Sequence, residues 1–600
     1  MYIFDETNTY FRNPAGAIES PGNLILQIKL RRGEALNPRV CLYLDGGAAN
    51  ETAMEYLHPD GAYDVYKSDI SFDNAGLYWY SFIVDTTGGV TFTVPEHAGG
   101  SFQATVFNPA NEWPEWIKGG TIYHIFVDRF YNSGLLGLNP GAVHRGDWGG
   151  CPYFLPDERG IVKNNDFFGG DLYGIIEKLP YLKELGVTCI YLSPVFEADS
   201  NHKYDTGNFM KVDEAFGGDE ALEKLCQKAG EFGMKVILDG VFNHVGSDSV
   251  YFNRYGKYDS IGAYQDRHNS PYKDWFMFND DGTYAAWWGI ELLPALNKQS
   301  EQYKEFLCGE NGVIAHWTRK GVSGWRLDVV DEIQDALLDP LCNSMRREKN
   351  DVYIVGEVWE DASHKIAYSA RRRYFLGGQL NAVTNYPLKN AIIACVKDGD
   401  VYALANAMAS LCKNYPKKVL DSLMNIVGTH DTMRILTVLS GADFPDTKIA
   451  MSHFRLSDGE VTLAKKRLKL AAALQFSLPG VPCVYYGDEA GMEGGADPFC
   501  RICYPWGHED NDLIDWYKKL AVIRKEHSCF IKGEYTLIEA RDGLYAFTRG
   551  EGDDRVLVAV NVSETEKTIT ASGFSFDLLR GVKTDALKIN AGEVGIFYAR

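Results

Sequence analysis

Acidic side chains follow four short apolar segments in the middle of the chain. The segments are residues 235–238, 324–327, 352–355 and 423–427, and the acids that follow them are Asp239, Asp328, Glu357 and Asp431. One carboxylate after a strand is usually the N-cap of the next helix. Four such carboxylates, with Arg326 two residues before Asp328, exceed what helix capping explains. Because His244 and His430 lie close to them in the sequence, we expect one site that contains all of these groups.

Glycoside cleavage is the chemistry that this set of residues fits best. Its oxocarbenium-like transition state is stabilised by an ionised carboxylate, and the leaving oxygen needs a proton donor. Arg326 would keep Asp328 ionised, which suits a nucleophile, whereas the apolar neighbours Val358 and Trp359 would raise the pKa of Glu357, which suits a general acid/base. A divalent-metal hydrolase is the alternative use of the same residues, but a cation at Arg326 would compete with the metal.

These side chains need a scaffold that gathers strand ends, and residues 116–524 have the pattern of one. Eight short apolar strands alternate there with helical segments, which predicts a closed parallel (β/α)₈ TIM barrel with its active site at the carboxyl ends of the strands. The predicted strands are residues 122–127, 187–192, 235–238, 324–327, 352–355, 380–384, 423–427 and 481–485. A helix is predicted over residues 219–232, with Asp219 as its N-cap. Residues 245–300 are too long for a simple loop and are expected to form an inserted subdomain.

The barrel is expected to be flanked by two β-sandwich domains, so the fold class is multidomain. Residues 1–115 contain short β-branched and aromatic runs, such as 24–30 and 78–84, separated by Asn, Gly, Pro and Asp. This spacing predicts an amino-terminal β-sandwich. Residues 525–600 return to the same pattern and predict a smaller carboxyl-terminal β-sandwich.

The four acidic segments resemble the four sequence blocks of the α-amylase family, glycoside hydrolase family 13. The corresponding segments are residues 239–244, 324–328, 356–359 and 429–431, in order and with barrel-like spacing. The resemblance implies that Asp328 is the nucleophile, Glu357 the general acid/base, and Asp431 the third carboxylate, which grips the sugar at the cleaved bond. A retaining mechanism implies that the carboxyl oxygens of Asp328 and Glu357 lie roughly 5–5.5 Å apart.

The same resemblance implies a set of substrate-binding side chains. They are Tyr204, Asp205, His244, Arg326, His430, Asp497 and Arg501. Two further candidates come from composition: residues 251–288 contain 12 aromatics, and at the end of this segment Trp287 and Trp288 are expected to stack on sugar rings. Asp239 and Asn243 are expected to support the loop that carries His244.

Within the family, the amino-terminal sandwich and residues 293–297 and 497–501 resemble neopullulanases, cyclomaltodextrinases and maltogenic amylases. The expected activity is therefore a retaining α-glucan hydrolase acting on α-1,4 bonds of malto-oligosaccharides, cyclodextrins, pullulan or starch, with α-1,6 bonds left open. The chain departs from the subgroup at Val330-Asp331, where Ala-Asn is usual, and at Glu360, where His is usual. Both departures lie toward the leaving group. They leave open an α-glucosyl transferase, while an inactive sugar-binding or scaffold relative is the alternative from another class.

No cofactor is expected, and the metal site is predicted to be absent. Calcium is left open by the resemblance, but residues 131–136 are poor in oxygen ligands for an ion that prefers six or more. Asp171 matches the second half of that calcium site and could equally cap a helix. Of the 12 cysteines, Cys500 and Cys503 form a CxxC pair with no second pair to complete a zinc site.

The composition limits the partners. The 600 residues carry a net charge of −21, which argues against nucleic acid or an anionic membrane. No run of 18 apolar residues and no signal peptide is seen, so a cytoplasmic location is expected. The expected partner is an α-glucan oligosaccharide, and the amino-terminal domain could also form a homodimer contact.

Overall fold

The computed structural model describes residues 2–96, 99–109, 113–137, 141–158 and 160–599. These residues form two compact units, which are treated separately below. The first comprises Met1–Glu112, Asp361–Asn381 and Asn406–Leu420, and the second comprises the remaining residues. The domain boundaries predicted at residues 115 and 525 stay predictions.

Eight parallel strands in the second unit confirm the predicted barrel. They pair in the order β23-β20-β19-β18-β15-β12-β25-β24, and a parallel bridge between Thr384 and Met424 joins the two ends of this series. The strands are β12 (Ile122–Ile125), β15 (Cys189–Leu192), β18 (Lys235–Gly240), β19 (Gly324–Leu327), β20 (Tyr353–Gly356), β23 (Ala382–Val383), β24 (Met424–Ile426) and β25 (Val481–Tyr485). Nearly every residue of these strands is buried, because helices cover the outside of the barrel and side chains fill its interior.

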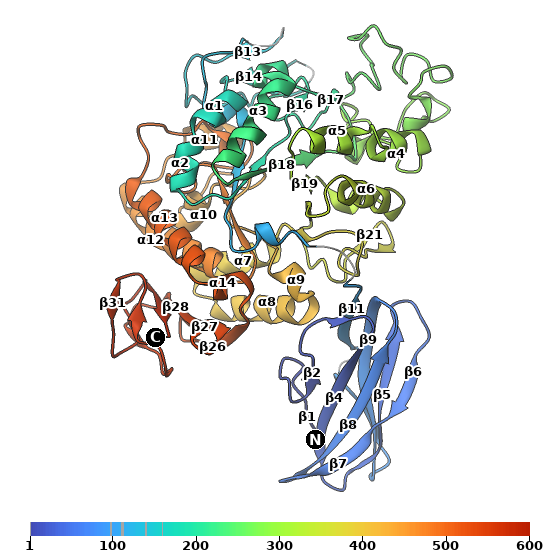
Figure 1. The fold of residues 1–600 in the computed structure, drawn as a ribbon, viewed down its shortest axis with the longest axis vertical. Helices are drawn as coiled ribbons and strands as arrows, with labels where there is room; N and C mark the ends of the chain where they lie inside the picture. The colour runs from blue at the N-terminus through green and yellow to red at the C-terminus, as the bar shows by residue number, and fades with distance from the viewer. Residues whose placement is uncertain (1, 97–98, 110–112, 138–140, 159, 600) are drawn as a thin grey trace. The chain divides into compact units, whose positions relative to one another are not determined.

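The described residues form fourteen α-helices, most of which connect the barrel strands of the second unit (Figure 1). They are α1 (Leu172–Glu177), α2 (Leu179–Glu184), α3 (Gly218–Glu231), α4 (Glu301–Cys308), α5 (Val313–Arg319), α6 (Asp335–Glu348), α7 (Tyr386–Ile393), α8 (Val401–Asn414), α9 (Lys417–Leu420), α10 (Ile435–Ser440), α11 (Lys448–His453), α12 (Asp458–Ser477), α13 (Asn511–Glu526) and α14 (Cys529–Lys532). The helix predicted over residues 219–232 is α3, but its N-cap was wrong. Gly217 occupies the N-cap, and the Asp219 carboxylate instead accepts a hydrogen bond from the Val212 backbone N–H at 2.9 Å.

Residues 245–300 leave the barrel after β18 and contain little regular structure. Two short 3₁₀ turns, Lys273–Trp275 and Trp287–Gly289, are present. Tyr251, Phe252 and Trp275 are buried, and Tyr251 and Trp275 both pack against Phe306 of α4. The segment therefore shares its aromatic core with the barrel, and its status as a separate subdomain stays a prediction. Isolated antiparallel bridges, such as that between His244 and Ala295, connect the segment back to the end of β18.

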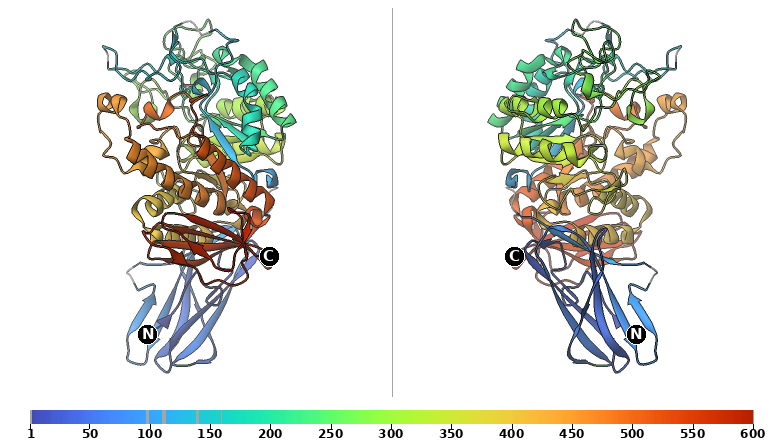
Figure 2. Two further views of the ribbon diagram at one scale, coloured as in Figure 1. Left: turned by 90° about the vertical axis from the view of Figure 1, so that its left-hand side faces the viewer. Right: turned by 90° about the vertical axis from the view of Figure 1, so that its right-hand side faces the viewer.

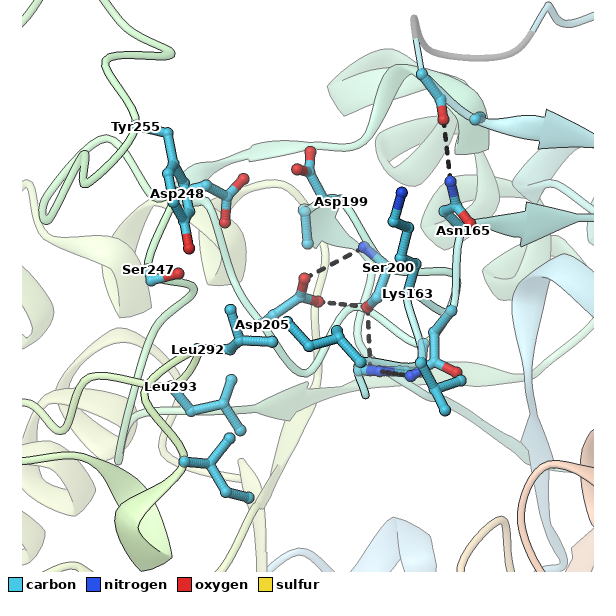
Figure 3. Close-up of a pocket in the computed structure, with 18 of the residues that line it drawn as sticks. Lys163, Asn165, Asp199, Ser200, Asp205, Ser247, Asp248, Tyr255, Leu292 and Leu293 are labelled. Carbon is cyan, nitrogen blue, oxygen red and sulfur yellow. Dashed lines mark hydrogen bonds between the residues drawn. The ribbon is translucent and has the colours of Figure 1, made fainter. Parts of the chain in front are cut away.

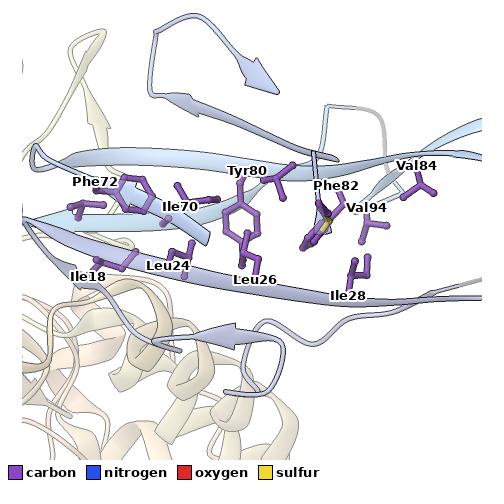
Figure 4. Close-up of a cluster of buried hydrophobic side chains, with 14 of the residues drawn as sticks. Ile18, Leu24, Leu26, Ile28, Ile70, Phe72, Tyr80, Phe82, Val84 and Val94 are labelled. Carbon is purple, nitrogen blue, oxygen red and sulfur yellow. The ribbon is translucent and has the colours of Figure 1, made fainter. Parts of the chain in front are cut away.

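The first unit contains the amino-terminal sandwich as two sheets. One has β1 (Tyr2–Ile3), β2 (Arg12–Asn13), β4 (Gly22–Arg31), β7 (Glu55–Asp60) and β8 (Tyr63–Phe72), and the other has β3 (Ile18–Glu19), β5 (Ala35–Leu44), β6 (Asn50–Ala53), β9 (Gly76–Thr86), β10 (Thr91–Val94) and β11 (Phe102–Phe107). Alternate residues of β4, including Leu24, Leu26 and Ile28, are buried and lie in one core with Tyr80 and Phe82 of the other sheet (Figure 4). This period of two is the sandwich pattern.

The carboxyl-terminal sheets confirm the second sandwich. Six antiparallel strands are β26 (Tyr535–Arg541), β27 (Leu544–Glu551), β28 (Asp554–Asn561), β30 (Phe576–Asp577), β31 (Val582–Lys583) and β33 (Val594–Tyr598), and two more are β29 (Lys567–Thr568) and β32 (Lys588–Ile589). Leu544, Leu557 and Phe597 belong to their buried core. These sheets lie beside α12 and α14 (Figure 2).

The remaining strands are short pairs in the connections. They are β13 (Val143–His144) with β14 (Asp166–Phe167), β16 (Phe196–Glu197) with β17 (Asn208–Val212), and β21 (Ile366–Ala367) with β22 (Ala370–Arg371). Among the helices that the structure describes, none has the length and apolar content needed to span a bilayer.

Candidate active site

One guanidinium binds three carboxylates at the carboxyl ends of neighbouring barrel strands. Arg326 Nη1 donates to Asp239 Oδ1 at 2.9 Å and to Asp328 Oδ1 at 2.8 Å, while its Nη2 lies 3.0 Å from Glu357 Oε2. The groups come from β18, β19 and β20, which are adjacent in the barrel. Arg326 and Asp328 lie two residues apart along the β19 segment and therefore point to the same side. All four side chains are buried.

Glu357 is held by two further donors. Its Oε2 accepts a hydrogen bond from the Val329 backbone N–H at 2.8 Å, and its Oε1 accepts one from Trp359 Nε1 at 3.0 Å. Val329 has a φ of 39°, a left-handed conformation that a β-branched residue rarely adopts. Trp359 stacks on Tyr386 with ring centroids 3.9 Å apart. The strained backbone of Val329 and the fixed indole of Trp359 thus orient the Glu357 carboxylate.

The electrostatics of this group are dominated by burial. Burial raises the pKa of Asp328 well above its usual range; Arg326 opposes the rise, and the nearby charges of Glu357 and Asp239 add to it. One cation serves three buried carboxylates, and the expectation that Arg326 keeps Asp328 anionic stays a prediction. Such an arrangement favours a proton held within the cluster.

A second group joins the first through Asp239. Tyr204 Oη donates to Asp239 Oδ2 at 2.9 Å and lies 2.6 Å from His430 Nε2, and its ring stacks on His430 with an interplanar angle of 7°. His430 Nε2 is also 3.1 Å from Asp431 Oδ2. Asp239, expected only to support a loop, is thus shared by Tyr204 and Arg326.

Asp431 also contacts the loop that follows β25, which carries Asp497 and Arg501. Arg501 Nη2 lies 3.4 Å from Asp431 Oδ1, and Arg501 Nη1 lies 2.8 Å from Asp497 Oδ1. Arg501 Nε donates to the His430 carbonyl at 2.9 Å. Burial raises the pKa of Asp431, and the Arg501 guanidinium opposes this rise.

A stack of three rings runs from His244 to the surface. His244 stacks on Trp287 with centroids 4.9 Å apart, and Trp287 stacks on Trp288 at 5.1 Å. Burial lowers the pKa of His244 to about 3, so the imidazole is neutral. Trp288 is 78% exposed, and its Nε1 donates to Glu332 Oε1 at 3.2 Å. Of the two tryptophans predicted from composition, Trp288 is exposed, and Trp287 is half-buried between it and the neutral His244; stacking of sugar rings on them stays a prediction.

Asp205 is the predicted site residue that stands apart from this cluster. Its carboxylate accepts hydrogen bonds from the Ser200 backbone N–H at 3.2 Å and from the Ser200 hydroxyl. It lines a cavity of about 650 Å³ with His202 and Leu293 (Figure 3). Asp328 and Glu357 are not among the residues that line this cavity.

In the loop that the resemblance associates with calcium, the side-chain oxygens of Asp171 and Asn132 accept hydrogen bonds within the protein. Asp171 caps α1: its Oδ1 accepts from the Gly174 N–H at 2.7 Å, and its Oδ2 accepts from the Ser133 N–H and hydroxyl at 3.0 and 2.8 Å. Asn132 Oδ1 accepts from the Gly134 N–H at 2.7 Å. Both side chains are acceptors within the protein, and the absence of a calcium site in this loop stays a prediction. Within the described ranges, no group of three or more His, Cys, Asp or Glu side chains is arranged to hold a metal ion.

Two neighbours of the cluster were missed or misread from the sequence. Trp359 was expected as an apolar wall, but its indole donates directly to Glu357. His124 on β12 was not predicted, although it is buried, stacks on Tyr191 at 4.2 Å and packs edge-on against His430 at 5.2 Å. A polar residue inside the otherwise apolar segment 122–127 was the available signal for His124.

Comparisons with known proteins agree with this geometry. Residues 124–513 match the family model described as the catalytic domain of alpha amylase. The chain is 34% identical to an amylopullulanase of Thermoanaerobacterium saccharolyticum, covering 99% of this chain and 51% of the relative. It is 33% identical to a cyclomaltodextrinase of Geobacillus thermopakistaniensis, covering 75% of this chain and 70% of the relative.

A solved structure matches over the full length. The type III pullulan hydrolase from Thermococcus kodakarensis aligns over 100% of both chains, with a TM-score of 0.69 and 25% identity. Against the amylopullulanases, by contrast, the chain spans only about a third to a half of the relatives' length (34%, 40% and 51%). Family model, relatives and barrel agree: the chain belongs to the α-amylase family, glycoside hydrolase family 13.

Proposed function

We propose that the protein is a retaining α-glucan hydrolase that cleaves α-1,4 glucosidic bonds by a two-step mechanism. The observation that carries this proposal is the Arg326 guanidinium, which holds Asp328 on one terminal nitrogen and Glu357 on the other. Two carboxyl groups fixed close together by one cation suit a nucleophile and an acid/base that act on the same bond.

In the first step, Glu357 donates a proton to the leaving oxygen while Asp328 attacks the anomeric carbon. Among the described residues, Arg326 donates to Asp328 Oδ1 and none donates to Oδ2, which leaves Oδ2 for the attack. As Glu357 loses its proton, the N–H groups of Val329 and Trp359 stabilise the carboxylate that forms.

In the second step, Glu357 takes a proton from water, and the water attacks the glycosyl–Asp328 ester. Two inversions at the anomeric carbon give net retention. Asp431 and His430 lie on the other side of Asp239 and are placed to hold hydroxyls of the same sugar. The buried Nε2 of His244 meets no partner among the described groups. Because Asn243 Nδ2 donates to His244 Nδ1 at 3.2 Å, Nε2 of the neutral imidazole carries the hydrogen and is available to donate it to a sugar hydroxyl.

The substrates are proposed from the relatives and from the site. Relatives named amylopullulanase, cyclomaltodextrinase and neopullulanase support pullulan, cyclodextrins and malto-oligosaccharides. The exposed Trp288 platform supports stacking of a sugar ring at the rim of the cleft. Glu332, which accepts the Trp288 indole N–H, follows Val330 and Asp331, where the sequence departs from the subgroup pattern. Because these departures lie toward the leaving group, where bond preference is set, the proposal includes cleavage of α-1,6 bonds.

An α-glucosyl transferase is the second candidate, and Trp288 is the observation that favours it. A ring that is 78% exposed and fixed by Glu332 can bind an acceptor sugar before water reaches the glycosyl–enzyme. Product analysis with added maltose separates the two functions: longer products indicate transfer, and glucose or maltose alone indicates hydrolysis.

The proposal is tested by Asp328→Asn. The variant should retain the fold and lose turnover of maltotriose, cyclodextrin and pullulan, whereas Asp515→Asn, an exposed position on α13, should behave as the native enzyme. Ordinary activity in Asp328→Asn would overturn the assignment of the nucleophile. Absence of cleavage by the native protein on every glucan would favour the sugar-binding or scaffold function.

We further propose that no resident calcium is needed, because Asp171 and Asn132 are already used as hydrogen-bond acceptors. A homodimer through the amino-terminal sandwich is also proposed. It is supported by β7, an edge strand on which Tyr56 and Leu57 are exposed, and sedimentation of native and Tyr56→Glu proteins tests it.

We also propose a reducing, cytoplasmic setting. Buried cysteines such as Cys189, Cys342 and Cys483 are free thiols in the structure, and unpaired cysteines are typical of reducing compartments. Fractionation of the source cells tests the location. Recovery from the medium or the periplasm would contradict it.

A further inference from the structure

A second cavity, of about 340 Å³, lies at the loops that follow β12 and β25. Its lining residues are Tyr131, Asn132, His144, Arg145, Gly146, Trp148, Phe168 and Trp506. It has no lining residue in common with the cavity that contains Asp205. None of the residues assigned above to catalysis or sugar binding lines it, so the mechanism gives it no role.

Trp148 supplies a flat apolar surface at this cavity. The side chain is 36% exposed, and its Nε1 donates to the Tyr504 carbonyl at 2.9 Å. No aromatic ring or cation among the described residues covers its ring. The indole is thus fixed by its only polar atom while a face stays open to a ligand, which reduces the entropy lost on binding.

The rest of the aromatic wall is equally rigid. Trp506 Nε1 donates to the Phe130 carbonyl at 2.5 Å. The Lys178 ammonium lies 4.0 Å from the centroids of both the Trp506 and Tyr131 rings. These contacts hold two rings in place, so the cavity is formed before any ligand binds.

The charged side chain of the cavity is already satisfied. Arg145 Nε and Nη2 donate to the Asp147 carboxylate at 2.9 and 2.7 Å, and its Nη1 donates to the Cys151 carbonyl at 2.8 Å. Asp166 adds a second carboxylate at 3.6 Å from Nη1. Since the donors and the charge of Arg145 are used within the protein, the cavity is not built for an anion.

Two polar groups remain for a neutral ligand. The Tyr131 hydroxyl and the His144 imidazole form no hydrogen bond with any residue that the structure describes. A ligand that presents a flat apolar face to Trp148 and hydroxyls to Tyr131 and His144 would match this lining. A glucose ring has both features, and the cavity is at the small end of the about 300–1,000 Å³ typical of ligand sites.

We propose that this cavity is a second binding site for α-glucan chains, separate from the catalytic cleft. The inference rests on the proposed function, since the polymer held here is the one that the cleft cleaves. A glucan long enough to reach both sites would bind more tightly than either site alone allows, whereas a trisaccharide would use the cleft only.

The test compares Trp148→Ala, Trp148→Phe and Tyr402→Ala, the last an exposed aromatic on α8 outside the cavity. Each substitution is combined with Asp328→Asn, and affinity for glycogen is measured by electrophoresis in glycogen-containing gels. Trp148→Ala should weaken glycogen binding by about fivefold or more, which is what the loss of one stacked ring predicts. Trp148→Phe should keep most of the binding, and Tyr402→Ala should match the parent.

A second readout separates this inference from the proposed function. In the Asp328-containing enzymes, kcat and KM for maltotriose report on the cleft alone. Unchanged glycogen affinity in Trp148→Ala, or an equal loss of maltotriose turnover, would overturn the second site. Failure of the native enzyme to cleave any glucan would instead overturn the proposed function, and binding of glycogen could still be measured.

Discussion

Two buried clusters of arginine and aspartate lie at strand ends of the same barrel, and they have different roles. After β12, Arg129 Nε donates to Asp128 Oδ2 at 2.6 Å, and both Asp128 oxygens also accept the Phe168 N–H. After β19, Arg326 serves three carboxylates, and Asp328 Oδ2 receives no hydrogen bond from the described residues.

The difference shows what makes a buried carboxylate reactive. The Arg129 cluster has its oxygens filled by backbone and guanidinium donors, so it fixes loops and has no oxygen left for a substrate. In the Arg326 cluster, by contrast, Asp328 Oδ2 lacks a donor among the described residues, and one cation faces three carboxylates. A buried ion group with unfilled acceptors is costly in free energy, and binding a sugar or a proton relieves it.

Replacing each arginine by methionine should give the largest contrast. Arg326→Met should lower kcat/KM by at least about 10²–10³-fold, because Asp328 and Glu357 lose the group that positions both. Arg129→Met should instead lower the free energy of unfolding by about 3–5 kcal/mol while the folded fraction keeps most of its turnover. Steady-state kinetics and urea unfolding measure the two effects. Arg129→Met with native stability and lost turnover would reverse the comparison.

Removing one donor to Glu357 sharpens the same contrast. Trp359→Phe keeps a ring on Tyr386 but deletes the indole N–H, and kcat should fall by about tenfold or more, the value of one hydrogen bond to a charged group. Trp516→Phe is the matched control, since Trp516 Nε1 donates to the Lys469 carbonyl on α12. Equal kinetics in both variants would show that the Trp359 bond has no part in catalysis.

The excess of negative charge around Arg326 predicts how kcat/KM depends on pH. The nucleophile must be ionised, and the pKa of Asp328 is raised by burial and by the charges of Glu357 and Asp239. The acid limb of kcat/KM should therefore lie above the usual range of an aspartate. Asp239→Asn removes one negative charge, which lowers the pKa of Asp328 and should move this limb to lower pH. A shift to higher pH in the variant's profile is the contradictory result.

The smallest expected effect concerns the loop beside the Arg129 cluster. Because Asp171 and Asn132 accept hydrogen bonds from backbone N–H groups, dialysis against EDTA should leave both activity and the thermal midpoint unchanged. Recovery of lost activity on adding Ca²⁺ would show that the loop rearranges to bind the ion.

The sequence was sufficient to predict the catalytic carboxylates, because they directly follow regular strands. The β18, β19 and β20 carboxylates could be predicted because each follows a buried run of the right length, and parallel strands bring their carboxyl ends together. Val329 could not be predicted as a backbone donor, because its left-handed conformation contradicts the preference of a β-branched residue. Nor could the sequence show that the Trp359 indole N–H points back to Glu357.

Strand β8 of the other unit (Tyr63–Phe72) could not be predicted from the sequence for a related reason. Asp64, Lys67 and Asp69 interrupt its apolar residues and hide the alternation, yet the side chains of Val65 and Phe72 are buried. Solvated charges on one face of a sandwich strand are compatible with pairing. Local pattern could not separate this strand from a loop, whereas its ten-residue register with β4 identifies it at once.

The central claim is that Asp328 forms a covalent bond to the sugar, and the configuration of the first product tests it most directly. Proton NMR of maltotriose or cyclodextrin cleavage, followed before mutarotation, should show the α-anomer first. The β-anomer as the first product would mean single inversion by water, and Asp328 could not then be the nucleophile.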